Sequence, residues 1–134
     1  MRVVVSHFFI EAYLLPWWLR HHREVFDHGV LIDRHSADGS GDICRGPVPS
    51  WEVVRSETAQ FAAIMCDFEV MKHEARFPDA WKIALTATEF LVARRLSEVE
   101  QFVTSRDLTA VRVPRAIMVD TEPDRAPDPN VALT

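Results

Sequence analysis

The residues best able to do chemistry lie in one acidic turn that follows a short apolar run, Val30–Ile32. The turn carries Asp33, Ser36 and Asp38 beside two glycines. Side chains just beyond the carboxyl ends of parallel strands can hydrogen-bond ribose hydroxyls and base nitrogens. The pattern therefore favours a nucleotide site. The alternative is that the carboxylates only cap a turn, since Asp is common beside Gly in loops.

Four histidines lie near this turn in the sequence and raise the question of a metal site. They are His21, His22, His28 and His35. His21 and His22 are adjacent on a predicted helix and so point to different faces. His22 also falls on an apolar stripe with Leu15, Leu19 and Phe26. The spacing favours packed or hydrogen-bonded histidines over metal ligands.

The turn is predicted to end one strand in an alternating series of strands and helices. Strands are predicted at 2–9, 30–33, 51–54 and 81–86, with a weaker one at 110–119. Helices are predicted at 11–26, 57–76 and 97–103, the last with Ser97 and Glu100 spaced as a capping box. A glycine turn is expected at 39–41. The apolar face of the helix at 57–76 comprises Phe61, Ile64, Met65, Phe68, Met71 and Ala75.

This order of elements predicts an α/β fold with a Rossmann-like, mostly parallel sheet and helices on both faces. The run Val3–Val5 is typical of a strand buried on both faces. Loops that follow parallel strands gather at one edge of the sheet. The loops expected there are 6–11, 33–41, 55–57 and 86–90.

Composition and charge exclude several classes of protein. Of 134 residues, 48% are hydrophobic and 26% charged, which fits a globular domain. The formal net charge of −5 leaves no general basic surface for nucleic acid. Cys44 and Cys66 are too few for a disulfide scaffold or zinc site, and we expect both to be inert. No apolar run could span a membrane and no signal-peptide pattern is seen, so we expect a cytoplasmic protein.

Three stretches closely resemble the family 2-like glycosyltransferases of the GT-A fold. Residues 11–22 read EAYLLPWWLRHH and residues 26–40 read FDHGVLIDRHSADGS. Members of that group carry Leu-Pro-x-Trp-Leu with paired histidines, then a strand ending in Asp-x-x-Ser-x-Asp-Gly. Residues 81–91, WKIALTATEFL, stand where members carry Trp-x-x-x-x-Asp-x-Asp-Glu-Phe-Leu. The likeness covers roughly two thirds of the chain.

The resemblance implies a protein that binds a nucleotide-sugar donor. In that group the Asp that matches Asp33 contacts uracil or ribose, and backbone near the position of Glu11 lies against the nucleotide. The donor-binding residues implied here are Glu11, Asp33, Ser36 and Asp38. A divalent cation, Mg²⁺ or Mn²⁺, held by the Asp-x-Asp motif would neutralise the leaving diphosphate.

The chain departs from the family pattern at the metal motif. Thr86 and Thr88 replace the two aspartates, and Ile10 replaces an Asn. Neutral hydroxyls are poor ligands for a hard cation, so we expect much reduced metal affinity, with Glu89 as the remaining candidate ligand. Thr86 and Glu89 also have the spacing of a capping box for a helix starting at Ala87. A cap and a vestigial donor site are both consistent with these residues.

We expect a nucleotide-sugar-binding domain at 1–119 and an extended Pro-rich tail at 120–134, with the C-terminal part of the fold incomplete. The chain would then be a truncated product, a fragment or an inactive member. If active, it would transfer a glycosyl group to the hydroxyl of an unknown acceptor. The second hypothesis is a non-catalytic remnant or interaction module, which forms a homo-oligomer or pairs with a partner to cover a sheet edge. A different nucleotide-binding α/β enzyme is weaker, because no Gly-x-Gly-x-x-Gly or Walker loop is present.

Overall fold

The computed structural model describes residues 1–92 and 95–117. These residues belong to two compact units. The first is Met1–Leu91, and the second begins at Val92. The predicted domain boundary at residue 119 stays a prediction, because residues 118–134, including the proposed tail, lie outside the described residues.

The first unit is built on a four-stranded sheet in which all strands are parallel, in the order β3-β2-β1-β4. The strands are β1 (Arg2–Phe8), β2 (His28–Asp33), β3 (Glu52–Arg55) and β4 (Trp81–Ala84). The predicted Rossmann-like parallel sheet is therefore confirmed, and its strand order is that of the first half of a doubly wound fold.

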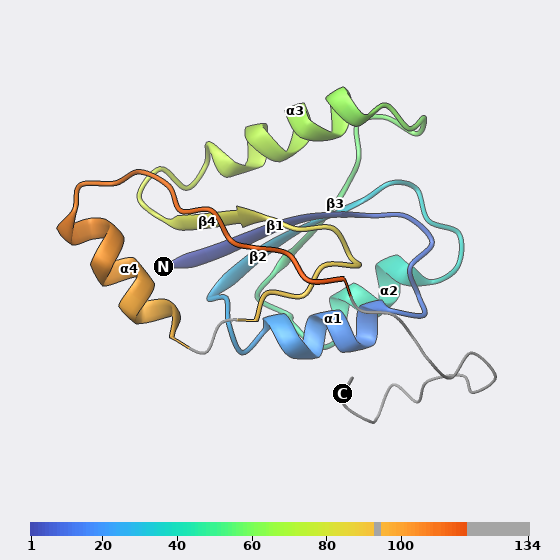
Figure 1. The fold of residues 1–134 in the computed structure, drawn as a ribbon. Coiled ribbons are helices and arrows are strands. Elements are labelled where there is room, and N and C mark those ends of the chain that lie inside the picture. Colours follow the sequence, from blue (N-terminus) through green and yellow to red (C-terminus); the bar gives the residue numbers. More distant parts are fainter. Residues whose placement is uncertain (93–94, 118–134) are drawn as a thin grey trace. The chain divides into compact units, whose positions relative to one another are not determined.

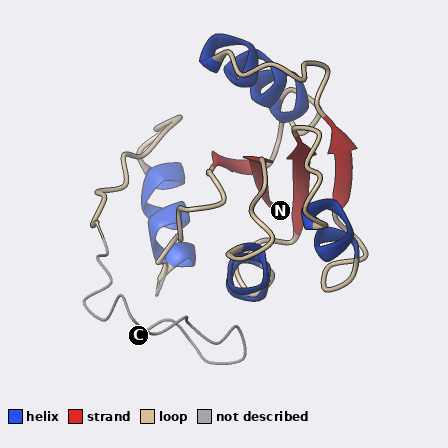
Figure 2. Cartoon of the chain, turned by 90° about the vertical axis from the view of Figure 1, so that its right-hand side faces the viewer, coloured by secondary structure: helices blue, strands red, loops and turns tan. Residues whose placement is uncertain are grey.

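Helices cover both faces of this sheet, as predicted (Figures 1 and 2). On one face lie α1 (Leu15–His22) and α2 (Ser40–Arg45), and on the other lies α3 (Ala63–Glu74). The second unit contains α4 (Leu96–Ser105). The four strands all point the same way, so their carboxyl ends form one edge.

The face under α1 and α2 is closely packed with apolar side chains. Leu15, Trp18 and Leu19 of α1 are at most 1% exposed. Gly29 of β2 lies directly against the Trp51 ring, and a Cβ at this position would overlap that ring. Glycine is therefore required here by the close approach of an indole.

The face under α3 is organised differently, and the predicted buried face of this helix is wrong. A small apolar cluster of Val5, Val30 and Ile32 receives Val70 from α3. The buried residue of α3, however, is Glu69. The residues predicted as its apolar face point outward, with Phe61, Ile64, Met65, Phe68 and Met71 exposed by 42 to 73%.

The helix boundaries also differ from those predicted. The helix predicted at 11–26 begins at Leu15, because the carbonyl of Glu11 first accepts hydrogen bonds from the N–H groups of Leu14 and Leu15 in a turn. The helix predicted at 57–76 begins at Ala63. Where a glycine turn was predicted at 39–41, α2 begins at Ser40, and Gly39 takes a positive φ of 87° before it.

Two expectations for the second unit are wrong. Residues 110–117 form no strand and are exposed, and Pro114 offers no backbone N–H for pairing. The predicted capping box at Ser97 does not form, since α4 begins one residue earlier after Arg95, which makes no side-chain cap.

Candidate nucleotide-binding site

The candidate site begins where the loops after β1 and β2 are joined. Arg34 N–H donates to the Phe8 carbonyl at 3.0 Å, and Ser56 N–H donates to the Asp33 carbonyl at 2.8 Å. These bonds continue the parallel pairing past the ends of the strands. The loops predicted to gather at this edge after β1, β2 and β3 are therefore brought together.

Side chains of the loop 36–40 hold the loop 10–12 in place. Three consecutive backbone N–H groups of the first-strand loop donate to three side-chain oxygens of the second. The pairs are Ile10 to Ser36 Oγ (3.1 Å), Glu11 to Ser40 Oγ (2.9 Å) and Ala12 to Asp38 Oδ2 (3.0 Å). Ser36 and Asp38 were predicted to contact a nucleotide. In the structure their side chains, with that of Ser40, form a clamp that holds the two loops together.

Asp38 is largely occupied by this clamp. Its Oδ1 accepts hydrogen bonds from the Ser40 hydroxyl at 2.5 Å and the Ser40 N–H at 3.1 Å, while Oδ2 accepts from Ala12. The hydrogen bond from the Ser40 hydroxyl lowers the pKa of Asp38. Burial, and then the nearby Asp38 charge, raise the pKa of Glu11. A negative charge at Asp38 therefore stabilises the loop geometry.

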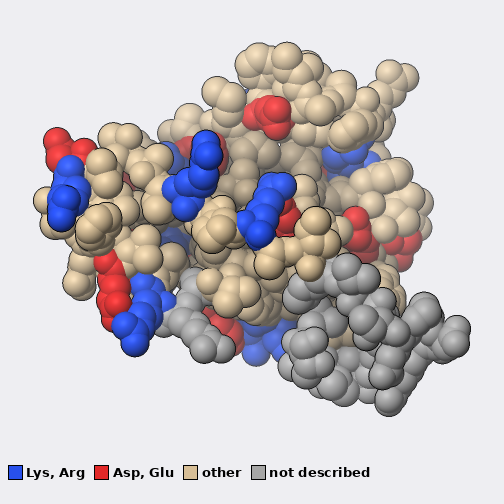
Figure 3. Space-filling view, in the orientation of Figure 1, with Lys and Arg blue, Asp and Glu red and all other residues tan. Residues whose placement is uncertain are grey.

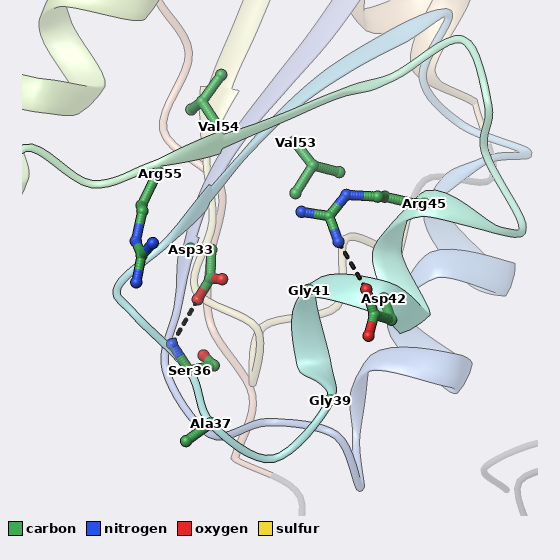
Figure 4. Close-up of a pocket in the computed structure, with 10 residues that line it drawn as sticks. All are labelled: Asp33, Ser36, Ala37, Gly39, Gly41, Asp42, Arg45, Val53, Val54 and Arg55. Atoms are coloured by element: carbon green, nitrogen blue, oxygen red, sulfur yellow. Dashed lines mark hydrogen bonds and ion pairs between the residues drawn. The ribbon is translucent and has the colours of Figure 1, made fainter.

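A polar pocket of about 480 Å³ opens beside this clamp. It lies at the carboxyl ends of β2 and β3 and against α2 (Figure 4). Of the four predicted donor-binding residues, Asp33 and Ser36 line the pocket, whereas Glu11 and Asp38 do not. The lining residues are Asp33, Ser36, Ala37, Gly39, Gly41, Asp42, Arg45, Val53, Val54 and Arg55.

Asp33 presents one carboxylate oxygen to this pocket. Its Oδ1 accepts the Ser36 N–H at 2.8 Å, which fixes the rotamer. Its Oδ2 faces Gly41, where a Cβ would come within 3.1 Å. No donor among the described residues is hydrogen-bonded to Oδ2. Asp33 can therefore accept a hydrogen bond from a ligand without breaking one in the protein.

Two pocket arginines were not among the predicted site residues. Arg55 Nε donates to His35 Nδ1 at 2.9 Å, and His35 Nε2 lies 3.1 Å from the Ser56 carbonyl. His35 accepts at Nδ1, so its Nε2 carries the proton and donates to that carbonyl. Arg45 Nη1 donates to Asp42 at 2.7 Å. Figure 4 shows Asp33, Arg45 and Arg55 extending toward the pocket from β2, α2 and β3.

Of these two arginines, only Arg55 could have been predicted as a site residue from the sequence. Arg55 ends β3 directly beside Asp33 in the strand register, so the predicted gathering of strand ends could have included it. Arg45 reaches the pocket only because α2 exists, and that helix was not predicted. Guanidinium groups suit bidentate contacts to phosphate, so both add a chemistry that the acidic turn alone lacks.

The segment Thr86–Glu89 forms half of a capping box and no helix. Thr86 N–H donates to Glu89 Oε2 at 2.8 Å, but Thr86 Oγ1 pairs with Thr88 Oγ1 at 2.9 Å. The chain makes a single turn there, so the helix predicted to start at Ala87 is wrong. Trp18 Nε1 of α1 donates to the carbonyls of Thr86 and Glu89, at 3.1 and 2.9 Å, and holds this turn against the packed face.

These residues do not fit a divalent cation. The Thr86 and Thr88 hydroxyls are neutral and share one hydrogen bond, and one Glu89 oxygen accepts a backbone N–H. Across the described residues, no group of three or more His, Cys, Asp or Glu side chains is arranged to hold a metal ion. Hard cations take six or more oxygen ligands, with carboxylates prominent among them. We therefore assign no metal ion to this turn.

His21 and His22 are structural, as predicted, although both reach the same residue. His21 Nε2 lies 2.8 Å from the Leu91 carbonyl, and His22 Nε2 accepts the Leu91 N–H at 3.1 Å. His22 Nδ1 lies 3.0 Å from the Trp18 carbonyl and must donate to it. The expectation that the two rings point to different faces is wrong. Burial lowers the pKa of His22 to about 4, so the ring is neutral.

Fold and site together define a small Rossmann-like α/β unit with a polar pocket at the carboxyl edge of its sheet. No helix within the described ranges is long and apolar enough to cross a membrane. Comparison with models of known protein families finds no match, and no curated protein is significantly similar to the sequence. The pocket itself must therefore support any functional conclusion.

Proposed function

We propose that this chain binds the nucleotide part of a nucleoside-diphosphate sugar in the pocket beside Asp33, as the donor-binding half of a glycosyltransferase-like protein. One observation carries the proposal. An open carboxylate oxygen and two guanidinium groups line one pocket at the carboxyl edge of a parallel sheet. This is where α/β proteins bind ligands, and its volume lies in the range of about 300–1,000 Å³ typical of small-molecule sites.

Each part of the pocket matches a part of such a ligand. Asp33 Oδ2 accepts a hydrogen bond from a ribose hydroxyl or a uracil N–H. Val53, on the same face of β3 as Arg55, gives the base an apolar wall. Arg45 and Arg55 contact the diphosphate, whose two negative groups they match in charge and geometry.

Binding, rather than turnover, is the activity that these residues support. In a transfer reaction an acceptor hydroxyl would attack the anomeric carbon, the bond to the diphosphate would break, and a base would take the hydroxyl proton. We assign no residue as that base. Because Thr86 and Thr88 replace the metal ligands of the group that the chain resembles, donor binding is proposed to proceed without a cation.

Isothermal titration calorimetry with UDP and UDP-sugars tests the donor site. We expect Asp33→Asn to weaken UDP binding at least about tenfold, as expected for a lost hydrogen bond to a charged group. Asp79→Asn, the same change at an exposed turn, should bind like the natural chain. Adding Mn²⁺ or EDTA should change nothing. Absence of binding to any of these ligands, or equal binding by Asp33→Asn, would contradict the proposal.

The arginines allow the phosphate part to be tested separately. Arg45→Gln and Arg55→Gln should weaken UDP binding while leaving uridine binding unchanged, because uridine has no diphosphate. Arg23→Gln provides the control, since Arg23 is exposed and pairs with Glu24 outside the pocket. Equal losses for UDP and uridine would show that the arginines only shape the pocket.

The alternative function is a non-catalytic interaction module of the same fold. One observation favours it, namely the exposed apolar residues of α3. For either function we propose a cytoplasmic location. Two free cysteines are consistent with a reducing compartment, and burial raises the pKa of the Cys44 thiol to about 12, which leaves it protonated and inert.

A further inference from the structure

The outer side of α3 carries an apolar stripe that the first unit does not bury. Ile64, Phe68 and Met71 follow one another along α3 at intervals of four and three residues, and Phe61 lies two residues before the helix begins. All are more than half exposed, and Met65 beside them is 42% exposed. Figure 3 shows the surface over α3 as mostly uncharged. The spacing is that of a helix-pairing seam, in which such residues repeat every 3.5 positions on average.

The orientation of α3 is fixed by a polar anchor on its inner side. Glu69 Oε2 accepts the Ser56 hydroxyl at 2.8 Å and lies 3.3 Å from His7 Nε2. Glu69 Oε1 accepts the backbone N–H of Glu57. Rotating α3 to bury Phe68 would withdraw this carboxylate from the Ser56 hydroxyl and the Glu57 N–H and break both hydrogen bonds. The outward position of the stripe is therefore a property of the fold.

The apolar surface continues beyond the helix. The Arg34 guanidinium lies 4.8 Å from the Phe61 ring centroid and 5.7 Å from that of Phe9, so it connects the two rings. Phe9 is itself 47% exposed. We call this surface the α3 patch; it comprises Phe9, Phe61, Ile64, Met65, Phe68 and Met71. With about 150–250 Å² for a fully exposed large side chain, the patch presents roughly 600 Å². That is the upper limit for a typical monomer.

We propose that a second copy of this chain covers the α3 patch, with α3 packed against α3 about a two-fold axis. A two-fold contact places the same patch on both sides, so apolar atoms meet apolar atoms without any complementary charge. Two patches together bury about 1,200 Å², which reaches the lower limit of specific, stable interfaces. If the partner surface were polar, the apolar side chains of the α3 patch would lie against polar groups that find no hydrogen-bond partner there. The seam spacing sets the two helices at about 20° to each other.

This dimer leaves the nucleotide pocket free. Asp33 and Gly29 alternate along β2 with Val30 and Ile32, and the latter two face α3. Successive side chains of a strand point to opposite faces, so Asp33 faces the α1 and α2 side. Dimerisation and nucleotide binding can therefore be tested, and can fail, independently.

Sedimentation velocity of the full chain, from low micromolar to several hundred micromolar, tests the dimer. The natural chain should shift from monomer to dimer over this range. Phe68→Asp and Met71→Lys should remain monomeric throughout, with unchanged circular dichroism, because both side chains are exposed in the single chain. Tyr13→Asp is the matched control, since Tyr13 is 58% exposed and contacts Trp17 of α1 instead. It should dimerise like the natural chain.

Three results would overturn the proposal. The first is a natural chain that stays monomeric across the range. The second is a dimer that survives both α3 substitutions. The third is a monomer in which Met71 resists oxidation by peroxide, which would show that residues from 92 onward, with their own exposed Leu108 and Val111, cover the patch in the same chain.

Discussion

The two faces of one sheet are stabilised in opposite ways. On one face α1 buries Leu15, Trp18 and Leu19 almost completely. On the other, α3 buries Glu69 and turns its large apolar residues to solvent. The apolar side of α1 faces inward, whereas in α3 Val70 reaches the apolar cluster and most of the large apolar residues face outward. The difference shows that a few directed polar bonds can set the rotation of a helix against its apolar pattern.

The packed face also fixes the loop after β4. Trp18 holds the Thr86–Glu89 turn, and His22 holds Leu91, so α1 fixes the loop after β4. The pocket beside Asp33 opens on this side of the sheet. The α1 and α2 face thus carries the pocket, whereas the α3 face presents exposed apolar residues to solvent.

The largest expected difference between the faces is in side-chain truncation. Leu19→Ala removes a fully buried side chain of α1 and should lower the free energy of unfolding by about 2–5 kcal/mol. Urea denaturation at neutral pH measures it. A loss below 1 kcal/mol would mean that the α1 face repacks freely and is not the rigid one.

A second difference is expected in pH dependence. The folded pKa of His22, about 4, lies below its ordinary value of 6.5, so the unfolded chain binds more protons between these values. Its stabilising contribution is complete above pH 6.5 and is lost as the pH falls toward 4. The loss is on the order of 3 kcal/mol. The cause is the burial of the ring, which disfavours its charged form, and protonated Nε2 would also no longer accept the Leu91 N–H.

The variant His22→Gln separates this contribution from others. Its amide oxygen can still accept the Leu91 N–H but does not titrate near pH 5. Urea denaturation at several pH values should show a shallower slope between pH 6.5 and 4. A remainder is expected from His7, whose pKa is also lowered by burial. An unchanged slope would place the pH sensitivity outside the α1 face.

The third difference concerns backbone spacing. Gly29→Ala places a methyl group into the Trp51 ring and should cost about 1–3 kcal/mol, as expected for overpacking. Gly46→Ala is the control, because a Cβ there would have its nearest neighbour at 4.0 Å and φ is −80°. Thermal denaturation of both variants measures the difference, and we expect the lower melting temperature for Gly29→Ala. Equal melting temperatures would show that the Trp51 ring moves aside at little cost.

The sequence predicted what local chemistry determines. The β-branched run Val3–Val5 and the apolar run before Asp33 became neighbouring parallel strands, and the acidic turn lies at the predicted sheet edge. Pro16 stands at the first turn of α1, where its missing N–H costs little. Each of these follows from propensity and alternation within a few residues.

The predictions failed where contacts between residues far apart in the sequence determine the structure. No periodicity could show that Glu69 would meet Ser56 and His7, and that encounter reversed the inner face of α3. Arg45 entered the pocket through a short helix that a positive φ at Gly39 starts. Both depend on contacts between segments far apart in the chain, which patterns within one segment do not contain.

The smallest expected effect is the sharpest test of the comparison. Met71→Ala is a truncation similar in size to Leu19→Ala, but its side chain is 59% exposed. In dilute solution, where a dimer would be dissociated, it should change the free energy of unfolding by less than about 0.5 kcal/mol. At high concentration the same variant should become less stable than the natural chain, because only the natural chain gains from association. A cost at dilution equal to that of Leu19→Ala would mean that Met71 is buried within a single chain, and the contrast between the two faces would then disappear.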